Sequence, residues 1–174
     1  VEIVDYSLLK CSNCSYEFAY PQIEGSSSFY DWVTLQNNYY PPIRWEYEKT
    51  LSILENKQVK LLDVGCGDGR FLDFIKKSNN KNIDYAGLDP TKKSVEICLE
   101  NGHKAYCMDI KMFKTKFKNK FFDYVTIFHV LEHIAYPKEF LEELISLTKP
   151  GGAVFASTPY SPMDFEVDWF DVLN

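Results

Sequence analysis

From Val59 onward, short apolar runs alternate with longer stretches in which apolar residues recur at helical spacing. The apolar runs predict strands at 59–64, 83–88, 104–107, 122–128 and 152–157. The amphipathic stretches between them predict helices at 69–77, 92–101 and 137–148. Strands that alternate with helices in this way indicate an α/β fold with a doubly wound, mainly parallel sheet. We expect the strand order 3-2-1-4-5, with the first of these strands in the middle.

The stretch between the third and fourth predicted strands is rich in lysine. Its lysines are Lys111, Lys114, Lys116, Lys118 and Lys120. A lysine run between two apolar segments is typical of a solvated loop, and we expect one here.

The first 58 residues do not follow this alternation. Residues 1–28 contain Cys11 and Cys14 and end on a run of glycine and serine, whereas residues 29–58 begin with a dense group of aromatic residues. Helical spacing follows Pro41 and Pro42, which suits prolines at a helix start. We therefore expect an N-terminal module at 1–28, an aromatic-rich helical lid at 29–58 and a ligand-binding core at 59–174.

Composition limits the classes of partner. The 174 residues are enough for one domain with a core, and the net charge of −6 argues against a nucleic-acid partner. No apolar run approaches the roughly 20 residues that a membrane-spanning helix needs. Five cysteines, an odd number, fit the reducing cytoplasm better than a disulfide framework.

The first strand of the core leads directly into a glycine-rich loop. Its glycines are Gly65, Gly67 and Gly69. Glycines at alternate positions let a ligand come close to the backbone, and ligands of such sheets bind beyond the carboxyl ends of the strands. The dinucleotide fingerprint needs its third glycine one position later, where Arg70 stands. Asp63 and Asp68 beside the loop also disfavour a pyrophosphate.

A sulfonium ligand with an α-amino group suits these carboxylates better. Asp63 would pair with the amino group, and Asp89, at the end of the second strand, would accept both hydroxyls of a ribose. Asp109 would accept the adenine amine, with Met108 and Ile110 against the ring. Asp89 would serve NAD equally well, and the simpler alternative is that these aspartates cap helices and turns.

Several segments carry a family resemblance, in the same order along the chain as in the family. They are LLDVGCGDG at 61–69, GLD at 87–89, FHVLEHI at 128–134, and KPGG at 149–152 followed by STP at 157–159. Together they resemble the motifs of class I S-adenosylmethionine-dependent methyltransferases. The resemblance is closest to the ubiquinone-biosynthesis O-methyltransferases and to bacterial small-molecule and sugar methyltransferases.

The resemblance implies S-adenosyl-L-methionine as the cofactor and methyl transfer to a small molecule, with a hydroxyl as the expected acceptor and a nitrogen or carbon acceptor as the alternative. It implies that Gly65, Cys66 and Gly67 line the cofactor, that Arg44 holds its carboxylate and that Phe128 contacts it. An NAD-dependent oxidoreductase and a cofactor-binding fragment without turnover are the alternatives.

The spacing of His129, Glu132 and His133 would put them on one face of a helical turn at the active end of the sheet. His129, or else His133, is the candidate general base, because a histidine pKa suits neutral pH. The ubiquinone-type enzymes resemble Glu-x-x-Glu-His here, a pattern that suggests a metal, but His129 replaces the first glutamate and we expect no tightly bound metal. The alternative is that the turn is only capped and packed. We expect His103 to be exposed.

Both ends of the chain raise further expectations. Cys11-Ser12-Asn13-Cys14 resembles the second knuckle of a small zinc module that precedes many such methyltransferases. We expect its other ligand pair upstream of Val1, and the alternative is that the present pair is vestigial. Residues 158–174 are too few for the helix and hairpin that usually complete the fold, so we expect that hairpin to be missing.

Overall fold

The computed structural model describes residues 5, 7–23, 25–26, 32, 44–118 and 121–159. Nearly half of the expected lid, residues 29–31 and 33–43, and the last residues of the chain therefore lie outside the described residues, and the expectations that concern them stay expectations. Near the N-terminus, β1 (Ser7–Lys10) and β2 (Glu17–Tyr20) form a two-stranded antiparallel sheet. No helix of the described segments is long and apolar enough to cross a bilayer.

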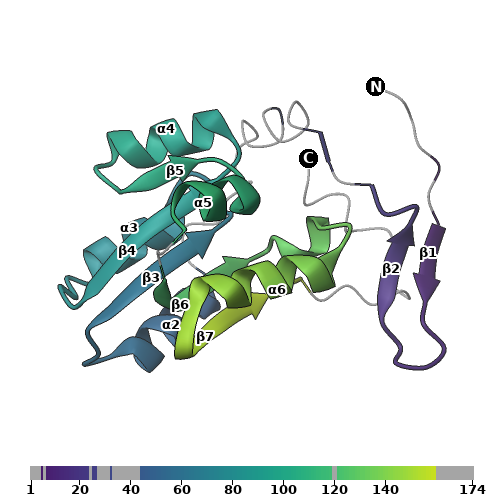
Figure 1. Cartoon of the computed structure of the whole chain (residues 1–174), viewed down its shortest axis with the longest axis horizontal. Coiled ribbons are helices and arrows are strands. Elements are labelled where there is room, and N and C mark those ends of the chain that lie inside the picture. The colour runs from purple at the N-terminus through teal and green to yellow at the C-terminus, as the bar shows by residue number, and fades with distance from the viewer. Residues whose placement is uncertain are drawn as a thin grey trace.

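The core is a five-stranded sheet whose neighbouring strands are all parallel (Figure 1). Its strands are β3 (Val59–Val64), β4 (Ile83–Asp89), β5 (Ala105–Cys107), β6 (Phe122–Phe128) and β7 (Thr148–Ser157). They lie in the order β5-β4-β3-β6-β7, so the first strand of the core is in the middle. The predicted fold class and strand order are confirmed.

Helices cover both faces of this sheet. They are α2 (Trp45–Leu54), α3 (Arg70–Lys77), α4 (Lys92–Glu100), α5 (Ile110–Lys116) and α6 (Pro137–Leu147), with the short 3₁₀ helix η1 (Leu131–His133) after β6. Leu61 and Leu62 are both fully buried, because successive residues of a strand point to opposite faces. Leu62 packs in a cluster with residues of α5 and α6, and Leu61 in a cluster with residues of α2 and α3.

The lysine-rich stretch is in part a helix, so the predicted loop is wrong. In α5, Ile110 and Phe113 are buried and Phe117 packs against them, a spacing of three and four that anchors one helical face. Asp109 caps the helix by accepting a hydrogen bond from the Met112 N–H at 2.7 Å. The side chains of Lys111, Lys116 and Lys118 are exposed, so only the solvated character of the stretch was predicted correctly.

The last strand begins earlier than the sequence predicts. β7 starts at Thr148, directly after α6, and its pairing with β6 jumps from Phe122–Thr148 to Tyr124–Ala153. Pro150 and Gly151 therefore lie in an irregularity within the strand instead of between helix and strand.

His103 is buried, contrary to the expected exposure. Its Nε2 lies 2.8 Å from Asp73 Oδ1, and its Nδ1 lies 3.4 Å from the Tyr85 hydroxyl. Because Asp73 belongs to α3 and Tyr85 to β4, the imidazole joins a helix to the sheet. Such a long-range partnership leaves no trace in the local pattern around Gly102.

The β7 irregularity generates a stability prediction. A Cβ at Gly152 would collide with the carbonyl oxygen of Asp123, which is backbone and cannot move aside easily. A Cβ at Gly151 would meet nothing within 4 Å, so its cost arises only from the φ of +81°. We expect Gly152→Ala to lower the free energy of unfolding by about 2–3 kcal/mol and Gly151→Ala by about 1 kcal/mol. Urea unfolding measures both, and equal losses would contradict the backbone collision.

Candidate functional site

The glycine loop lies at the carboxyl end of β3 and curls back toward β4. Gly65, Gly67 and Gly69 have φ angles of +75°, +53° and +88°, which favour glycine. The N–H groups of Gly65 and Cys66 donate to the Leu88 carbonyl at 2.7 and 3.2 Å. The loop is thus fixed to the end of β4.

Asp89 is the side chain that joins the two strand ends. Its Oδ2 accepts a hydrogen bond from the Gly67 N–H at 2.9 Å, and its Oδ1 accepts one from the Thr91 N–H at 2.8 Å. The residue is only 7% exposed, and burial raises the pKa of the carboxyl group although both N–H donors oppose the rise. The Thr91 side chain also hydrogen-bonds to this group, and a carboxylate has about four acceptor sites, so Asp89 still keeps some acceptor capacity.

Asp63 is a second buried carboxyl group at the end of β3. Its Oδ1 accepts a hydrogen bond from the Thr126 hydroxyl at 2.7 Å. Burial, with a smaller contribution from the charge of Asp89, raises the pKa of Asp63 to about 7. A cation placed beside it would favour the ionised form.

Two further side chains of the loop have different roles: Cys66 packs beneath the loop, and Asp68 has a carboxylate oxygen without a partner among the described residues. Arg70 Nε donates to Asp68 Oδ2 at 2.8 Å, whereas the buried Asp68 Oδ1 has no hydrogen-bond partner among the described residues. The Cys66 thiol is buried beneath the loop with Cys98, whose Sγ donates to the Gly67 carbonyl at 3.3 Å. The proximity of Cys98 together with burial raises the pKa of Cys66, which makes its thiol a packing group.

The residues expected against adenine follow β5. Met108 is half-buried and Asp109 is exposed, with its Oδ1 engaged in capping α5. Ile110 is 6% exposed and packs in the sheet core. Asp109 therefore caps a helix, as the simpler alternative expected, but only one of its two carboxylate oxygens is engaged in the cap.

His129 follows β6 in a left-handed conformation, with φ at +56°. Its N–H donates to the Ser157 carbonyl at 2.9 Å, which ties the ends of β6 and β7 together. Its Nε2 lies 2.7 Å from Glu46 Oε1, and its Nδ1 lies 3.7 Å from Glu132 Oε1. Burial is the main cause that lowers the pKa of His129, and Arg44 adds to it while Glu46 opposes it.

The expected helical face of three side chains does not form. His129 precedes η1 and is not part of it, so only Glu132 and His133 belong to the helical turn. Desolvation and the nearby His129 lower the pKa of His133. Among the residues that the structure describes, no group of three or more histidine, cysteine, aspartate or glutamate side chains is arranged to hold a metal ion.

Glu46 is the site residue that sequence reasoning missed. It lies on the inner face of α2 and is 4% exposed, and the Ser157 hydroxyl donates to the same Oε1 at 3.3 Å. The sequence offered one signal, the spacing of four by which Glu46 shares a helical face with Thr50 and Leu54, and the structure shows all three buried. A glutamate in such a row is rarely buried unless it has a partner.

Two further expected residues flank this group. Arg44 occupies the N-cap position of α2 without a side-chain capping hydrogen bond, and its charge reaches both His129 and Glu132. The Phe128 ring lies 5.9 Å from the ring centroid of Tyr47 and 5.2 Å from that of Phe71, in an aromatic cluster between β6, α2 and α3. Burial raises the pKa of Tyr47 to about 12, so its hydroxyl stays protonated.

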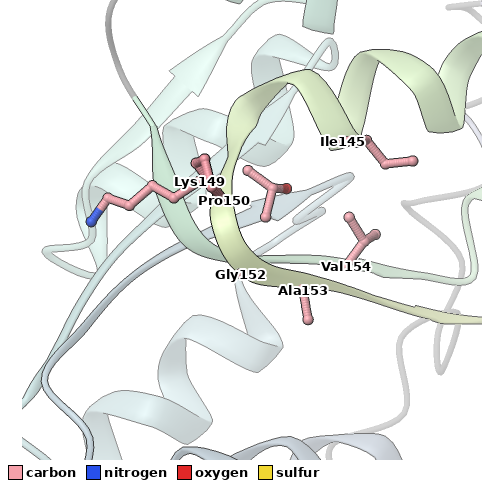
Figure 2. Close-up of a pocket in the computed structure, with 7 residues that line it drawn as sticks. Ile145, Lys149, Pro150, Gly152, Ala153 and Val154 are labelled. Carbon is pink, nitrogen blue, oxygen red and sulfur yellow. The ribbon is translucent and has the colours of Figure 1, made fainter.

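A hollow of about 480 Å³ lies elsewhere, between α6 and the start of β7 (Figure 2). Its lining residues are Ile145, Thr148, Lys149, Pro150, Gly152, Ala153 and Val154. The charged group among them, Lys149, is paired with Asp123 at 2.8 Å. Because the strands are parallel, the start of β7 lies at the edge of the sheet opposite the glycine loop, so this hollow does not belong to the site.

Known proteins resemble the chain over the region that holds the site. The ubiquinone biosynthesis O-methyltransferase of Coxiella burnetii is 29% identical over 123 residues, which cover 67% of this chain and 50% of that protein. The enzyme of the same name from Aliivibrio fischeri is 30% identical over 141 residues, which cover 73% of this chain and 57% of that protein. The chain thus spans about half the length of the curated relatives it matches.

Two solved structures share the fold. One is coclaurine N-methyltransferase, with 15% identity, a TM-score of 0.51, and coverage of 71% of this chain and 38% of that one. The other is the [4+2]-cyclase SpnF, with 22% identity, a TM-score of 0.51, and coverage of 68% and 48%. Since one of them is named a cyclase, the fold alone does not define the reaction.

A family model described as a methyltransferase domain matches residues 42–171, which include the glycine loop, both buried aspartates and His129. This chain belongs to that methyltransferase domain family.

Proposed function

We propose that the protein binds S-adenosylmethionine at the glycine loop and transfers its methyl group to a small-molecule acceptor, with a hydroxyl as the expected acceptor atom. The observation that carries the proposal is Asp89, a buried carboxyl group that accepts a hydrogen bond from the Gly67 N–H and still keeps some acceptor capacity at the end of β4. Two ribose hydroxyls are the donors that such a carboxylate suits.

The residues present fit this cofactor. Asp63, Asp68 and Asp89 surround the loop with carboxyl groups, and the Asp68 Oδ1 is buried without a partner among the described residues. Such a site favours a ligand with cationic and hydroxyl groups over a pyrophosphate. When bound, the cofactor supplies an electrophilic methyl group on its sulfonium.

The proposal gives each expected site residue a role. Asp63 pairs with the α-amino group, the backbone of residues 67–69 lines the methionine portion, and Gly65 and Cys66 also line the cofactor. Arg44 takes the carboxylate. Met108 and Asp109 face the adenine, to which Ile110 contributes little because it packs in the core. Phe128 contacts the cofactor.

Catalysis then depends mainly on positioning, because methyl transfer is an in-line displacement. His129 is our candidate base: it lies at the carboxyl end of β6, and burial lowers the pKa of its ring, so the ring is neutral at pH 7. His133 is the second candidate. The hydroxyl proton of the methyl acceptor would pass to the neutral ring of His129 while the hydroxyl oxygen bonds to the methyl carbon.

We also propose that Cys11 and Cys14 form half of a zinc site. Both lie in the turn between β1 and β2, where the Ser15 N–H donates to the Cys11 carbonyl at 2.9 Å. Hydrogen bonds from the backbone of Cys14 and Asn13 lower the pKa of the Cys11 thiol, as a metal ligand requires. All five cysteines are free thiols, which fits our assignment to the cytoplasm.

Replacing Asp89 tests the ribose position. We expect Asp89→Ala to weaken binding of S-adenosylhomocysteine by about 2 kcal/mol, because two charge-assisted hydrogen bonds to the ribose are lost. Calorimetry measures the affinity, with NADH as a ligand that should not bind. Asp84→Ala, an exposed change on the same strand, should leave the affinity unchanged. An unchanged affinity in Asp89→Ala would contradict the proposal that the ribose hydroxyls bind to Asp89.

The pKa of Asp63 generates a pH dependence. Only the ionised carboxylate can neutralise the α-ammonium group, so affinity for S-adenosylhomocysteine should rise as the pH passes through the pKa of about 7. From pH 6 to pH 8 we expect an increase of about tenfold, measured by calorimetry. Asp63→Asn should bind weakly and lose most of this dependence, whereas exposed Asp84→Asn should keep it. A flat profile in the unmodified protein would contradict the assignment.

His129 is tested with any hydroxyl compound that supports turnover. We expect His129→Ala to lower kcat by roughly 100-fold and to leave cofactor affinity nearly unchanged. His133→Ala on the adjacent turn is the comparison, and its effect should be much smaller. Lost cofactor affinity with kcat preserved would make His129 a wall of the binding site instead of the base.

A further inference from the structure

Glu46 lies where three elements far apart in the sequence meet. It comes from α2, its partner His129 follows β6, and the Ser157 that donates to the same oxygen ends β7. The Glu46 side chain is 5% exposed and the His129 side chain is 25% exposed. The carboxylate is therefore an interior group, whereas part of the ring remains accessible.

The hydrogen bond at 2.7 Å determines which ring nitrogen carries the proton. A carboxylate can only accept, so His129 Nε2–H is the donor to Glu46 Oε1. In a neutral ring the lone pair is then on Nδ1. Glu132 Oε1 lies 3.7 Å from Nδ1, which is too far for a hydrogen bond, so Glu132 does not occupy that lone pair.

We propose that Glu46 is a positioning residue for methyl transfer: it fixes His129 in the Nε2–H tautomer, so that Nδ1 is the atom that receives the acceptor's proton. This inference rests on the proposed function. The acceptor O–H bond breaks and an Nδ1–H bond forms, while the oxygen bonds to the methyl carbon and the pair of the C–S bond stays on sulfur. Glu46 then stabilises the resulting imidazolium, as the orienting carboxylate of a catalytic triad does.

Four charged or titratable groups face the ring from the elements packed against it. Glu46 raises the pKa of His129 and Arg44 lowers it, both from α2. From η1, Glu132 is itself partly desolvated, and His133 has its own pKa lowered by the proximity of His129. Removing the charge of Glu46 therefore leaves burial and Arg44 unopposed, and the pKa of His129 should fall further.

The tautomer is directly measurable by long-range ¹H–¹⁵N NMR of the imidazole, on the whole chain and without an acceptor. We expect the unmodified protein to show His129 protonated on Nε2, and a proton on Nδ1 would overturn the inference without any variant. In Glu46→Gln the side-chain amide can donate or accept, so we expect mixed tautomers and a lower pKa for the ring. Glu48→Gln, an exposed change on the same helix, should leave both unchanged.

Kinetics supply the second measurement. With a turnover-supporting hydroxyl compound, Glu46→Gln should lower kcat by roughly tenfold or more, move the acidic limb of its pH profile to lower pH, and leave the KM for the cofactor nearly unchanged. Glu46→Asp keeps the charge and should restore part of the rate. An unchanged kcat and pH profile in folded Glu46→Gln would overturn the inference.

The two proposals fail in different ways. If the unmodified protein does not bind S-adenosylhomocysteine, the proposed function fails whatever the tautomer. If it binds and turns over but Glu46→Gln behaves like Glu48→Gln, only the role of Glu46 fails.

Discussion

The hydrogen bond from the Gly67 N–H to Asp89 holds the glycine loop in place, and the site depends on it. Because that loop has left-handed φ angles at alternate residues, it would not keep its shape by local preference alone. The parallel pairing of β3 with β4 sets Asp63 beside Gly87, two residues before Asp89. Gly87 has no side chain, and the Cys66 thiol occupies the space that a Cβ would need. The shape of the glycine loop, the register of β3 against β4 and the position of the Cys66 thiol therefore depend on one another.

Burying carboxyl groups is expensive, and this site buries two near each other. For Asp63 the pKa in the folded state, about 7, lies above the ordinary value of 3.8. The folded state therefore binds more protons than the unfolded chain between these values, and stability falls as the pH rises from about 4 to 7. A bound cation beside Asp63 reverses that loss. The site is thus less stable when empty and ionised than with its ligand, which is a usual cost of a preformed binding site.

Local patterns were sufficient to predict the sheet and the glycine loop, because strands, glycine turns and acidic strand ends depend on residues within a few positions of one another. The alternation does not by itself decide the strand order, and 3-2-1-4-5 was expected as a common order of doubly wound sheets. The pair formed by Glu46 and His129 could not be predicted this way, since 83 positions separate the two residues and only the folded sheet brings them together. The partners of buried His103 are likewise 18 and 30 positions away. Helix α5 was missed for another reason, because its lysines hid the spacing of Ile110, Phe113 and Phe117.

The span between Glu46 and His129 also bears on how the molecule acquires its site. Closing a long loop costs chain entropy before any contact can offset it, so distant pairs form later in folding than neighbouring strands do. The Ser157 hydroxyl is 111 positions from Glu46, farther still. The glycine loop and β4 are only about twenty positions apart and can associate early. We therefore expect the glycine loop and β4 to associate before α2 and β7 close on the histidine ring.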